Sequence, residues 1–508
     1  MARLSELLAG VAEARIVSGQ PDLDIGEVHD DSRRVHRGDL FVAVPGTVQD
    51  GRKYIDDALA KGATAILTET SGAFDAQLAG KAALVLVPNV RQALGRVAAN
   101  RFAASSSLTL TGVTGTNGKT TTTYLVESIL AAAGRKPGVI GTVGYRFGGK
   151  QKEAALTTPG ALELHRLLAE MKQAGASDAV MEASSVALDQ GRVAGCRFRV
   201  AALTNVTQDH LDYHATMERY FVAKSILFRE LMMPSSGVAV FFADDPQGLA
   251  MQEEASCTVL TLSRKNHGAD VVVLDQQLRH DGIRLTLGAP NGPIAITSHL
   301  VGEFNLANIL TAVGIALGLG ISTSAIATGI ARLHGVPGRL EAVANEAGVL
   351  CVVDYAHTPD ALERALDVLR PLTKGRLICV FGCGGDRDHG KRPLMGEAAA
   401  KRADIALVTS DNPRTEKADS IIDMILEGVR RTKKSERSAG ELAQGQTGFH
   451  VEPDRAAAIS RAVAVARLGD VILVAGKGHE DYQIIGTEKT HFDDREIASA
   501  AFAARRGA

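Results

Sequence analysis

The sequence predicts an α/β protein of three domains: a small N-terminal α/β domain, a central parallel-sheet domain with a phosphate-binding loop (P-loop), and a C-terminal Rossmann-like α/β domain. A chain of 508 residues exceeds the usual size of one domain. Short apolar runs alternate with helical patterns in two separate series, which is typical of parallel sheets covered by helices. A Gly/Pro-rich segment at 334–341 separates the two series. We place the domains at residues 1–105, 106–335 and 336–508.

The first domain is expected from three strand-like runs, LFVAVPG, TAILTE and ALVLVP, between Gly/Asp turns and Ala-rich helical patterns. The stretch ASSS at 104–107 is interpreted as a linker to the central domain.

The central domain begins with LTLTGV, a glycine-rich loop and the helical segment TTYLVESILAAAG, which ends at glycine. Further strands are expected at 178–184, 200–206 and 237–245. The uncharged stretch 304–331 is long enough to span a membrane. Its Asn residues, its Ser/Thr residues and the break GLGIS instead predict two short helices in a water-soluble core.

The C-terminal domain is expected from strands at 349–356, 376–382, 403–410 and 469–476, each followed by a polar, glycine-containing loop and a helix. Ligands of such sheets bind at the carboxyl ends of the strands. Residues 433–448 are interpreted as an exposed surface loop.

Composition excludes several classes of protein. A net charge of −2 and a pI near 6.7 argue against nucleic acid as a partner. The five scattered cysteines favour buried thiols in a reducing compartment over disulfides. The N-terminal stretch lacks the apolar core of a signal peptide. We therefore expect a cytoplasmic, monomeric protein with no membrane partner.

The segment TGTNGKTTT, Thr114–Thr122, lies between the first central strand and its helix. The strict phosphate-loop pattern requires a glycine five places before Gly118, and that position is Val113. Backbone N–H groups at a helix N-terminus still favour an anion there. Lys119 adds a positive charge for phosphates and Thr120 a hydroxyl for Mg²⁺. A glycine turn that only joins strand to helix is the alternative, and the strand–loop–helix context favours phosphate binding.

Three further residues indicate chemistry near this loop. Glu182 ends a strand and is a hard oxygen ligand suited to Mg²⁺, although a solvated glutamate is the simpler alternative. His210, in DHLDYH, follows the next strand and can share the same edge. Lys224 lies in an apolar helical pattern, so it either reaches the surface or is buried and needs its charge neutralised. The sequence leaves that choice open.

Ten motifs occur in one order: TGTNGKTTT, MEASS, TNVTQDHLDYH, AKSILF, GEFNLANIL, PGRLE, DYAHTPD, GCGGDRD, TSDNPRTE and GKGHE. Together they resemble the Mur ligase family of peptidoglycan synthesis, which comprises ATP-dependent amide-forming enzymes of three domains. The resemblance covers essentially the whole chain. It implies a central ATPase domain and a reaction in which ATP phosphorylates a carboxylate before an amine attacks the acyl phosphate.

The resemblance implies roles for particular residues. It makes Lys119, Lys224, Glu182 and His210 catalytic. ATP would bind to Gly115, Thr116, Asn117, Gly118, Lys119, Thr120, Thr121, Asn305, Arg339 and Asp354. Mg²⁺ would be held by Thr120, Glu182, His210 and Lys224, the last as a carbamate derived from CO2.

Within the family, DNPR resembles the motif that selects meso-2,6-diaminopimelate, which is added to UDP-N-acetylmuramoyl-L-alanyl-D-glutamate. A guanidinium at Arg414 could bind the distal carboxylate through two hydrogen bonds. The diaminopimelate site would comprise Arg387, Asp411, Asn412, Pro413, Arg414, Gly476 and Glu480. The nucleotide-sugar site would comprise Ser32, Thr47, Gln49, Thr157, Thr158, Ser184, Gln190 and Arg192. Leu156 departs from the pattern, because relatives commonly have asparagine there.

Three alternative functions remain. A lysine-adding relative shares most motifs but typically lacks the arginine of DNPR. A folylpolyglutamate synthase-like ligase shares the phosphate loop, but DNPR, GKGHE and the extra N-terminal domain oppose it. A nucleotide-dependent switch would leave the C-terminal polar cluster unexplained.

Overall fold

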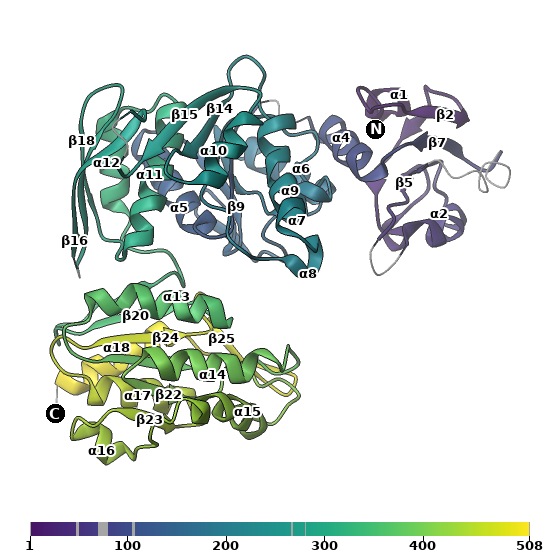
Figure 1. The fold of residues 1–508 in the computed structure, drawn as a ribbon. Helices are drawn as coiled ribbons and strands as arrows, with labels where there is room; N and C mark the ends of the chain where they lie inside the picture. The colour runs from purple at the N-terminus through teal and green to yellow at the C-terminus, as the bar shows by residue number, and fades with distance from the viewer. Residues whose placement is uncertain are drawn as a thin grey trace. The chain divides into compact units, whose positions relative to one another are not determined.

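The computed structural model describes residues 2–46, 50–69, 80–103, 107–265, 268–279 and 281–506. Residues 104–106 of the predicted linker at 104–107, and the predicted boundary at 105/106, lie outside these residues. Two compact units are present: residues 1–274, 286–295 and 307–330 form one, and 275–285, 296–306 and 331–508 form the other. Figure 1 shows the chain coloured from N- to C-terminus.

The N-terminal part is a five-stranded sheet in the order β2-β7-β6-β5-β4. Strands β4 to β7 pair in parallel, and β2 is antiparallel to β7. Helix α4 (Val90–Phe102) packs its apolar face on this sheet, and Val90, Leu94 and Val97 are buried. The other elements are β1 (Ala2–Arg3), α1 (Leu4–Leu7), β2 (Arg15–Ser18), β3 (Asp24–Ile25), β4 (Val28–His29), β5 (Leu40–Val42), α2 (Ile55–Ala60), β6 (Ala65–Glu69) and β7 (Ala83–Val87).

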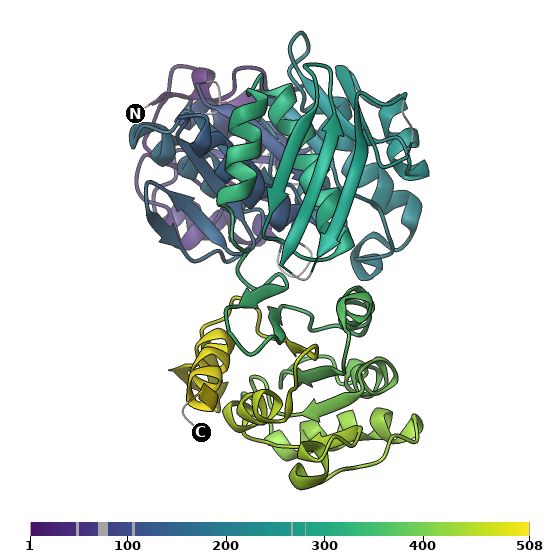
Figure 2. The same cartoon turned by 90° about the vertical axis from the view of Figure 1, so that its left-hand side faces the viewer.

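The central part is built on an 11-stranded sheet in the order β11-β10-β9-β12-β8-β13-β14-β15-β16-β17-β18, whose long strands are seen side by side in Figure 2. Strand β8 lies between β12 and β13 and is parallel to both, so their carboxyl ends share one edge. The strands are β8 (Thr109–Thr114), β9 (Pro137–Gly141), β10 (Gly144–Phe147), β11 (Lys150–Lys152), β12 (Asp178–Glu182), β13 (Phe198–Leu203), β14 (Val238–Phe242), β15 (Thr258–Ser263), β16 (Val271–Arg279), β17 (Gly282–Gly288) and β18 (Ile294–Ser298).

Helices accompany this sheet as expected from the alternating pattern. The stretch 304–331 folds as two helices, α11 and α12, as predicted. Within the described ranges, the longest apolar helices are too short or too polar to cross a bilayer. The helices are α5 (Lys119–Ala132), α6 (Ala161–Gln173), α7 (Ser185–Asp189), α8 (Leu211–His214), α9 (Met217–Glu230), α10 (Pro246–Glu253), α11 (Glu303–Gly318) and α12 (Thr323–Arg332).

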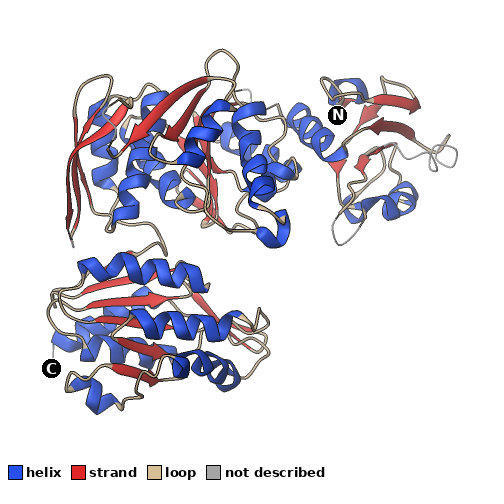
Figure 3. Cartoon of the chain, in the orientation of Figure 1, coloured by secondary structure: helices blue, strands red, loops and turns tan. Residues whose placement is uncertain are grey.

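The C-terminal part is a six-stranded sheet in the order β19-β20-β24-β21-β22-β23, parallel except for β19. One face packs on α13, α14 and α15, and the other on α16, α17 and α18. Figure 3 shows helices on both faces of the strands. The strands are β19 (Glu341–Val343), β20 (Leu350–Asp354), β21 (Leu377–Phe381), β22 (Ile405–Val408), β23 (Gly448–Val451), β24 (Val471–Ala475), β25 (Tyr482–Ile485) and β26 (Glu488–His491). The helices are α13 (Pro359–Leu369), α14 (Lys391–Arg402), α15 (Ala418–Arg431), α16 (Ala439–Ala443), α17 (Arg455–Val465) and α18 (Asp494–Arg506).

This helix–sheet–helix layering confirms the Rossmann-like prediction, and all eight strands expected from 108 onward are present. The interpretation of 433–448 as an exposed loop was wrong in its second half. Ser438 and Glu441 form a capping box that begins α16, and Leu442 is fully buried. All five cysteines are free and four are buried, as predicted.

Candidate active site

The phosphate loop joins β8 to α5, and two glycines shape it. Gly115 has φ +141° and Gly118 has φ +88°, values that other residues rarely adopt. A side chain at Gly115 would meet the Thr204 hydroxyl, and one at Gly118 would meet the Asn308 carboxamide. Gly115 and Gly118 therefore shape the loop without a glycine at position 113. That position is Val113, whose side chain is buried in the strand.

Strand β13 supports the loop through a residue that the sequence analysis missed. Asn205 accepts the Thr116 N–H at its carbonyl (2.9 Å) and the Asn117 N–H at its side chain (3.1 Å). The Thr116 hydroxyl lies 3.0 Å from that of Tyr220 on α9. Asn205 lies two residues after the end of β13, which neighbours β8, and this position near the carboxyl edge of the sheet is the signal that could have found it.

Two lysines converge on the carbonyl oxygen of Gly115. Lys119 donates to it (2.9 Å) and to the Thr116 carbonyl (2.9 Å). Lys224, which is 1% exposed, donates to the same Gly115 oxygen (3.0 Å), and its Nζ lies 4.3 Å from the centre of the Tyr220 ring. Burial, with Lys119 as a second cause, lowers the pKa of Lys224 well below its usual value. The structure thus resolves the open choice in favour of a buried lysine.

Glu182 ends β12 and is buried, and within the described part of the chain the hydrogen-bond donors to its carboxylate are neutral. The Thr120 hydroxyl donates to Oε2 (3.1 Å). Thr142, which follows β9, donates its N–H to Oε1 (2.9 Å) and its hydroxyl to Oε2 (3.1 Å). A buried carboxylate with neutral partners is a favourable place for a cation. Thr120 and Glu182 are brought together as predicted, and Thr142 is an addition.

His210 is related to the loop only through Tyr220. It is exposed at the start of α8, with φ +53°, and its ring centre lies 6.3 Å from that of Tyr220. Because Tyr220 also contacts Thr116 and Lys224, His210 lies on the rim of the same loop. Its role as a metal ligand stays a prediction.

Five of the predicted nucleotide-sugar residues form one hydrogen-bonded group beside Glu182. Thr158 donates to the Glu182 carbonyl (2.7 Å), and Arg192 donates to the Thr158 carbonyl (3.1 Å). The remaining links are Thr157 Oγ1 to Thr142 Oγ1 (3.1 Å), Ser184 N–H to Thr158 Oγ1 (3.1 Å) and Arg192 Nη2 to Gln190 Oε1 (2.7 Å).

The other predicted nucleotide-sugar residues belong to the N-terminal sheet. Ser32 is buried in a short 3-10 helix, Ser32–Arg34, and its carbonyl accepts from Lys61 (3.1 Å). Thr47 and Gln49 lie outside the described residues. Leu156, the departure from the family pattern, is half-exposed, and its carbonyl accepts the Tyr145 hydroxyl (2.9 Å).

Three predicted ATP contacts belong to the second compact unit. Asp354 ends β20 and accepts the N–H groups of Leu340 (2.7 Å) and Ala356 (2.9 Å). Burial raises the pKa of this carboxyl, and Arg339 opposes the shift. The Arg339 guanidinium lies 5.5 Å from the centre of the Tyr355 ring. Asn305 is buried near the start of α11 and donates to the Val301 carbonyl (2.8 Å).

The predicted diaminopimelate residues gather at the carboxyl ends of β24, β21 and β22. Asn412 donates to Glu480 Oε2 (3.0 Å), and its Oδ1 accepts from Lys477 (2.8 Å). Lys477 is fully buried and also lies 3.3 Å from Asp411. Gly476 has φ +119°, and a side chain there would lie 3.0 Å from the Asp411 carboxylate. Lys477, in GKGHE, was missed although its motif was noted.

Arg414 is held at the same edge by its backbone and its side chain. It has φ +51°, its N–H bonds to the Ile484 carbonyl (3.1 Å), and its guanidinium donates to the Gly385 carbonyl (2.9 Å). It does not start a helix, since α15 begins at Ala418. Burial is the main cause of the raised pKa of Glu480, and repulsion from the Asp411 carboxylate is the second cause. Arg387 is exposed, and Pro413 packs beside Gly385.

The fold and these two polar edges define an α/β enzyme class with a glycine-rich strand–loop–helix on one sheet and a cluster of charged side chains at the edge of a second. Family models match three parts of the chain: "Mur ligase family, catalytic domain" at 24–102, "Mur ligase middle domain" at 113–316 and "Mur ligase, glutamate ligase domain" at 338–478. The chain belongs to the Mur ligase family.

Curated relatives match the chain over its whole length. UDP-N-acetylmuramoyl-L-alanyl-D-glutamate–2,6-diaminopimelate ligase of Gloeobacter violaceus is 48% identical, covering 99% of each chain. The protein of the same name from Geobacter metallireducens is 46% identical, covering 98% of each. A solved structure with that name has a TM-score of 0.73 at 33% identity and 99% coverage of each chain. These matches confirm the predicted family and three-domain fold.

Thr142 gives a test of the phosphate-loop half of the site. Thr142→Val removes one of the three donors to Glu182 and is expected to weaken apparent Mg²⁺ affinity by about 10- to 100-fold, as loss of outer-shell partners does. Titration of ATP-dependent activity with Mg²⁺ measures this change. Thr142→Ser keeps the hydroxyl and should retain near wild-type affinity. Equal behaviour of the two variants would show that Thr142 does not position Glu182.

Proposed function

We propose that this protein joins meso-2,6-diaminopimelate to UDP-N-acetylmuramoyl-L-alanyl-D-glutamate at the expense of ATP. The observation that carries the proposal is the group Asp411, Asn412, Arg414 and Glu480 at the carboxyl edge of the C-terminal sheet. It offers both a guanidinium and a carboxylate, which complement the distal carboxylate and ammonium of diaminopimelate. Full-length relatives named for this reaction support the same choice.

The first step would be phosphoryl transfer. A carboxylate oxygen of the dipeptide attacks the γ-phosphorus of ATP, the bond to the β,γ-bridging oxygen breaks, and ADP leaves. Loop N–H groups and Lys119 would hold the phosphates in line, which is the main work in this chemistry. Lys119 must then exchange the Gly115 and Thr116 carbonyls for phosphate oxygens.

Mg²⁺ fits the buried pair Thr120 and Glu182, because both offer hard oxygen atoms and Glu182 has only neutral donors on its carboxylate. When bound, the ion would offset the charge of the phosphates. His210 on the rim is proposed to complete this site.

Lys224 would serve as a second anionic ligand after reaction with CO2. The neutral amine nitrogen attacks the carbon of CO2, forms an N–C bond and releases one proton, which leaves a carbamate. The lowered pKa of Lys224 supports this, because only the neutral amine is nucleophilic. The burial that disfavours the ammonium thus prepares the group for carboxylation.

The second step would be amide formation. The amine of diaminopimelate attacks the acyl carbon, a tetrahedral intermediate forms, and phosphate leaves as the C–O bond breaks. Arg414 and Glu480 would orient the amino acid by its distal end. A site built for the distal carboxylate rejects lysine, because lysine leaves Arg414 unpaired. We place this ATP-consuming reaction in the cytoplasm.

Substrate competition tests the proposal. Purified protein is incubated with ATP, Mg²⁺ and the UDP-linked dipeptide together with meso-diaminopimelate or L-lysine, and separately with folate and glutamate. Phosphate release and a ligated product are expected only with meso-diaminopimelate. Turnover with lysine alone, or with folate and glutamate alone, would replace the proposed function by one of those activities.

A further inference from the structure

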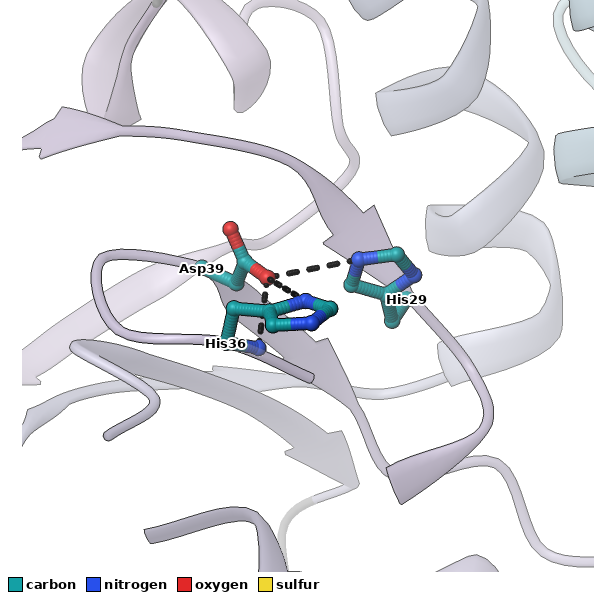
Figure 4. Close-up of side chains that lie close together, drawn as sticks. All are labelled: His29, His36 and Asp39. Carbon is teal, nitrogen blue, oxygen red and sulfur yellow. Dashed lines mark hydrogen bonds and ion pairs between the residues drawn. The ribbon is translucent and has the colours of Figure 1, made fainter. Parts of the chain in front are cut away.

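Two histidines and an aspartate converge in the N-terminal sheet, around the segment that contains Ser32, and none of the three is assigned to the ligase reaction. His29 ends β4, Asp39 directly precedes β5, and His36 lies in the segment between these two parallel strands. Figure 4 shows both imidazole rings directed at one carboxylate oxygen of Asp39. Their ligand atoms all lie within 4.8 Å of one another. From this geometry we propose that His29, His36 and Asp39 bind a transition-metal ion such as Zn²⁺.

The distances are close to those of a metal site. Two ligands of a tetrahedral Zn²⁺, each about 2.0–2.1 Å from the ion, lie about 3.3 Å apart. His29 Nε2 is 3.3 Å from Asp39 Oδ2, and His36 Nδ1 is 3.8 Å from the same oxygen. The side chain of His36 is 83% exposed. Its ring can therefore move to bring the three ligand atoms, which lie within 4.8 Å of one another, closer together without disturbing the core.

The carboxylate is oriented as a metal-ligating carboxylate usually is. Asp39 is buried, its Oδ1 accepts the Glu27 N–H (2.8 Å) and its Oδ2 accepts the His36 N–H (2.8 Å). Such outer hydrogen bonds hold a ligand in place. Two charged residues act on His29. The carboxylate of Glu27 would attract a bound cation, and the guanidinium of Arg34 would repel it.

The donor set selects the type of ion. Two imidazole nitrogens and one carboxylate suit Zn²⁺, Co²⁺ or Ni²⁺, whereas Mg²⁺ prefers oxygen ligands only. Three protein ligands leave a fourth position for water. With two imidazoles among its three ligands, this site has more nitrogen donors than the proposed magnesium site, where His210 would be the one imidazole.

Metal binding would fix one particular segment. His29 and Asp39 flank the residues that contain the short helix Ser32–Arg34, and His36 follows that helix. An ion bound to all three residues would tie this segment to the edge of the sheet at both of its ends. The metal proposal itself does not depend on the ligase function, since none of its three residues is assigned to that reaction.

Spectroscopic titration with Co²⁺ tests the site. The full-length protein, without a histidine tag, is titrated with Co²⁺ in excess Mg²⁺, which keeps the proposed magnesium site occupied. We expect one saturable Co²⁺ per chain with visible absorption of imidazole-bound cobalt, displaced by Zn²⁺. His36→Ala changes an exposed residue and removes a direct ligand, so it should weaken binding by more than about 100-fold, beyond the 10- to 100-fold effect typical of an outer-shell change.

Two further variants complete the test. His491 forms an exposed pair with Glu496 (2.8 Å) elsewhere in the chain, so His491→Ala is a matched control that should bind Co²⁺ like wild type. His29→Gln should lose binding as His36→Ala does, and circular dichroism shows whether it is folded. Absence of saturable binding, or unchanged binding by His36→Ala, would overturn the proposal. Loss of binding in His491→Ala alone would place the metal elsewhere and would also overturn it.

Discussion

Replacing Lys224 with alanine is expected to lower kcat about 10²- to 10³-fold, the usual effect of removing one preorganised charge from an active site. The loss follows from the proposed carbamate, which would add a second anionic ligand beside Glu182. Lys224→Arg keeps a positive charge but cannot form the carbamate, so it should be equally impaired. Steady-state kinetics of ATP-dependent ligation measure both variants.

Chemical rescue separates this role from simple damage. A short carboxylic acid supplied to Lys224→Ala should restore part of the activity, whereas Lys224→Arg has no space for it and should not respond. In the wild type, ¹³C-bicarbonate should produce a carbamate carbon signal that Lys224→Ala lacks. A fully active Lys224→Arg, or a wild type without that signal, would contradict the proposed carbamate.

The same residue should reduce stability while it supports activity. Lys224→Met keeps much of the side-chain volume and removes a buried amine, so we expect the free energy of unfolding to rise by about 1–3 kcal/mol in CO2-free buffer. The pKa of Lys224 is lowered in the folded state, so the unfolded chain binds its proton more tightly. Wild-type stability therefore rises with pH up to about 10.4, the ordinary lysine pKa.

Denaturant unfolding across this pH range measures the effect. The advantage of Lys224→Met over wild type should shrink as pH rises toward the ordinary lysine pKa, because the amine is then neutral in both states. Bicarbonate should alter the stability of the wild type only. A constant difference at all pH values would show that Lys224 does not pay a desolvation cost in the folded protein.

Replacing Arg414 with glutamine is expected to raise KM for meso-diaminopimelate about 10- to 100-fold, since a hydrogen bond to a charged group contributes about 1.5–3 kcal/mol. The variant should also lose much of its preference for meso-diaminopimelate over lysine. KM for ATP should stay unchanged, because no phosphate contact is proposed for Arg414. Kinetics with each amino acid varied in turn measure these effects.

A matched variant controls for the loss of a surface charge. Arg431 is a half-exposed arginine on α15 that pairs only loosely with Glu397 (3.8 Å), so Arg431→Gln should leave both KM values unchanged. An equal rise in KM for ATP and for diaminopimelate in Arg414→Gln would indicate a distorted fold. An unchanged KM for diaminopimelate would remove Arg414 from the pocket.

The buried strands of the parallel sheets could be predicted from sequence because they are continuous apolar runs that end in polar loops. Some of the strands that were not anticipated differ in pattern. Strand β16 (Val271–Arg279) is buried for three residues and exposed for six, and β11 (Lys150–Lys152) is exposed throughout. Such strands carry little apolar signal, because pairing with neighbouring strands rather than burial of side chains defines them.

Some residues of the candidate site could be predicted from sequence, and others could not. Residues in glycine-rich or charged motifs, such as Lys119, Glu182 and Arg414, could be selected from sequence because their residue types indicate their chemistry. Thr142 and Asn205 act by positioning other groups, and threonine and asparagine after a strand are common without any role. Lys477 was overlooked because its place in the cluster depends on contacts with Asp411 and Asn412, 66 and 65 positions away in the chain.

The carbonyl oxygen of Gly115 would couple the binding of nucleotide at Lys119 to the proposed uptake of CO2 at Lys224. This oxygen accepts both Lys119 and Lys224, so any change that removes one ammonium alters the partners of the other. In the proposed reaction, phosphate binding would draw Lys119 away, and uptake of CO2 would convert Lys224 into an anion that attracts Lys119. Thermodynamic linkage requires that the effect of CO2 on nucleotide affinity equal the effect of nucleotide on CO2 affinity. Dissolved CO2 should therefore change the affinity for nucleotide, and nucleotide should change carbamate occupancy by the same factor.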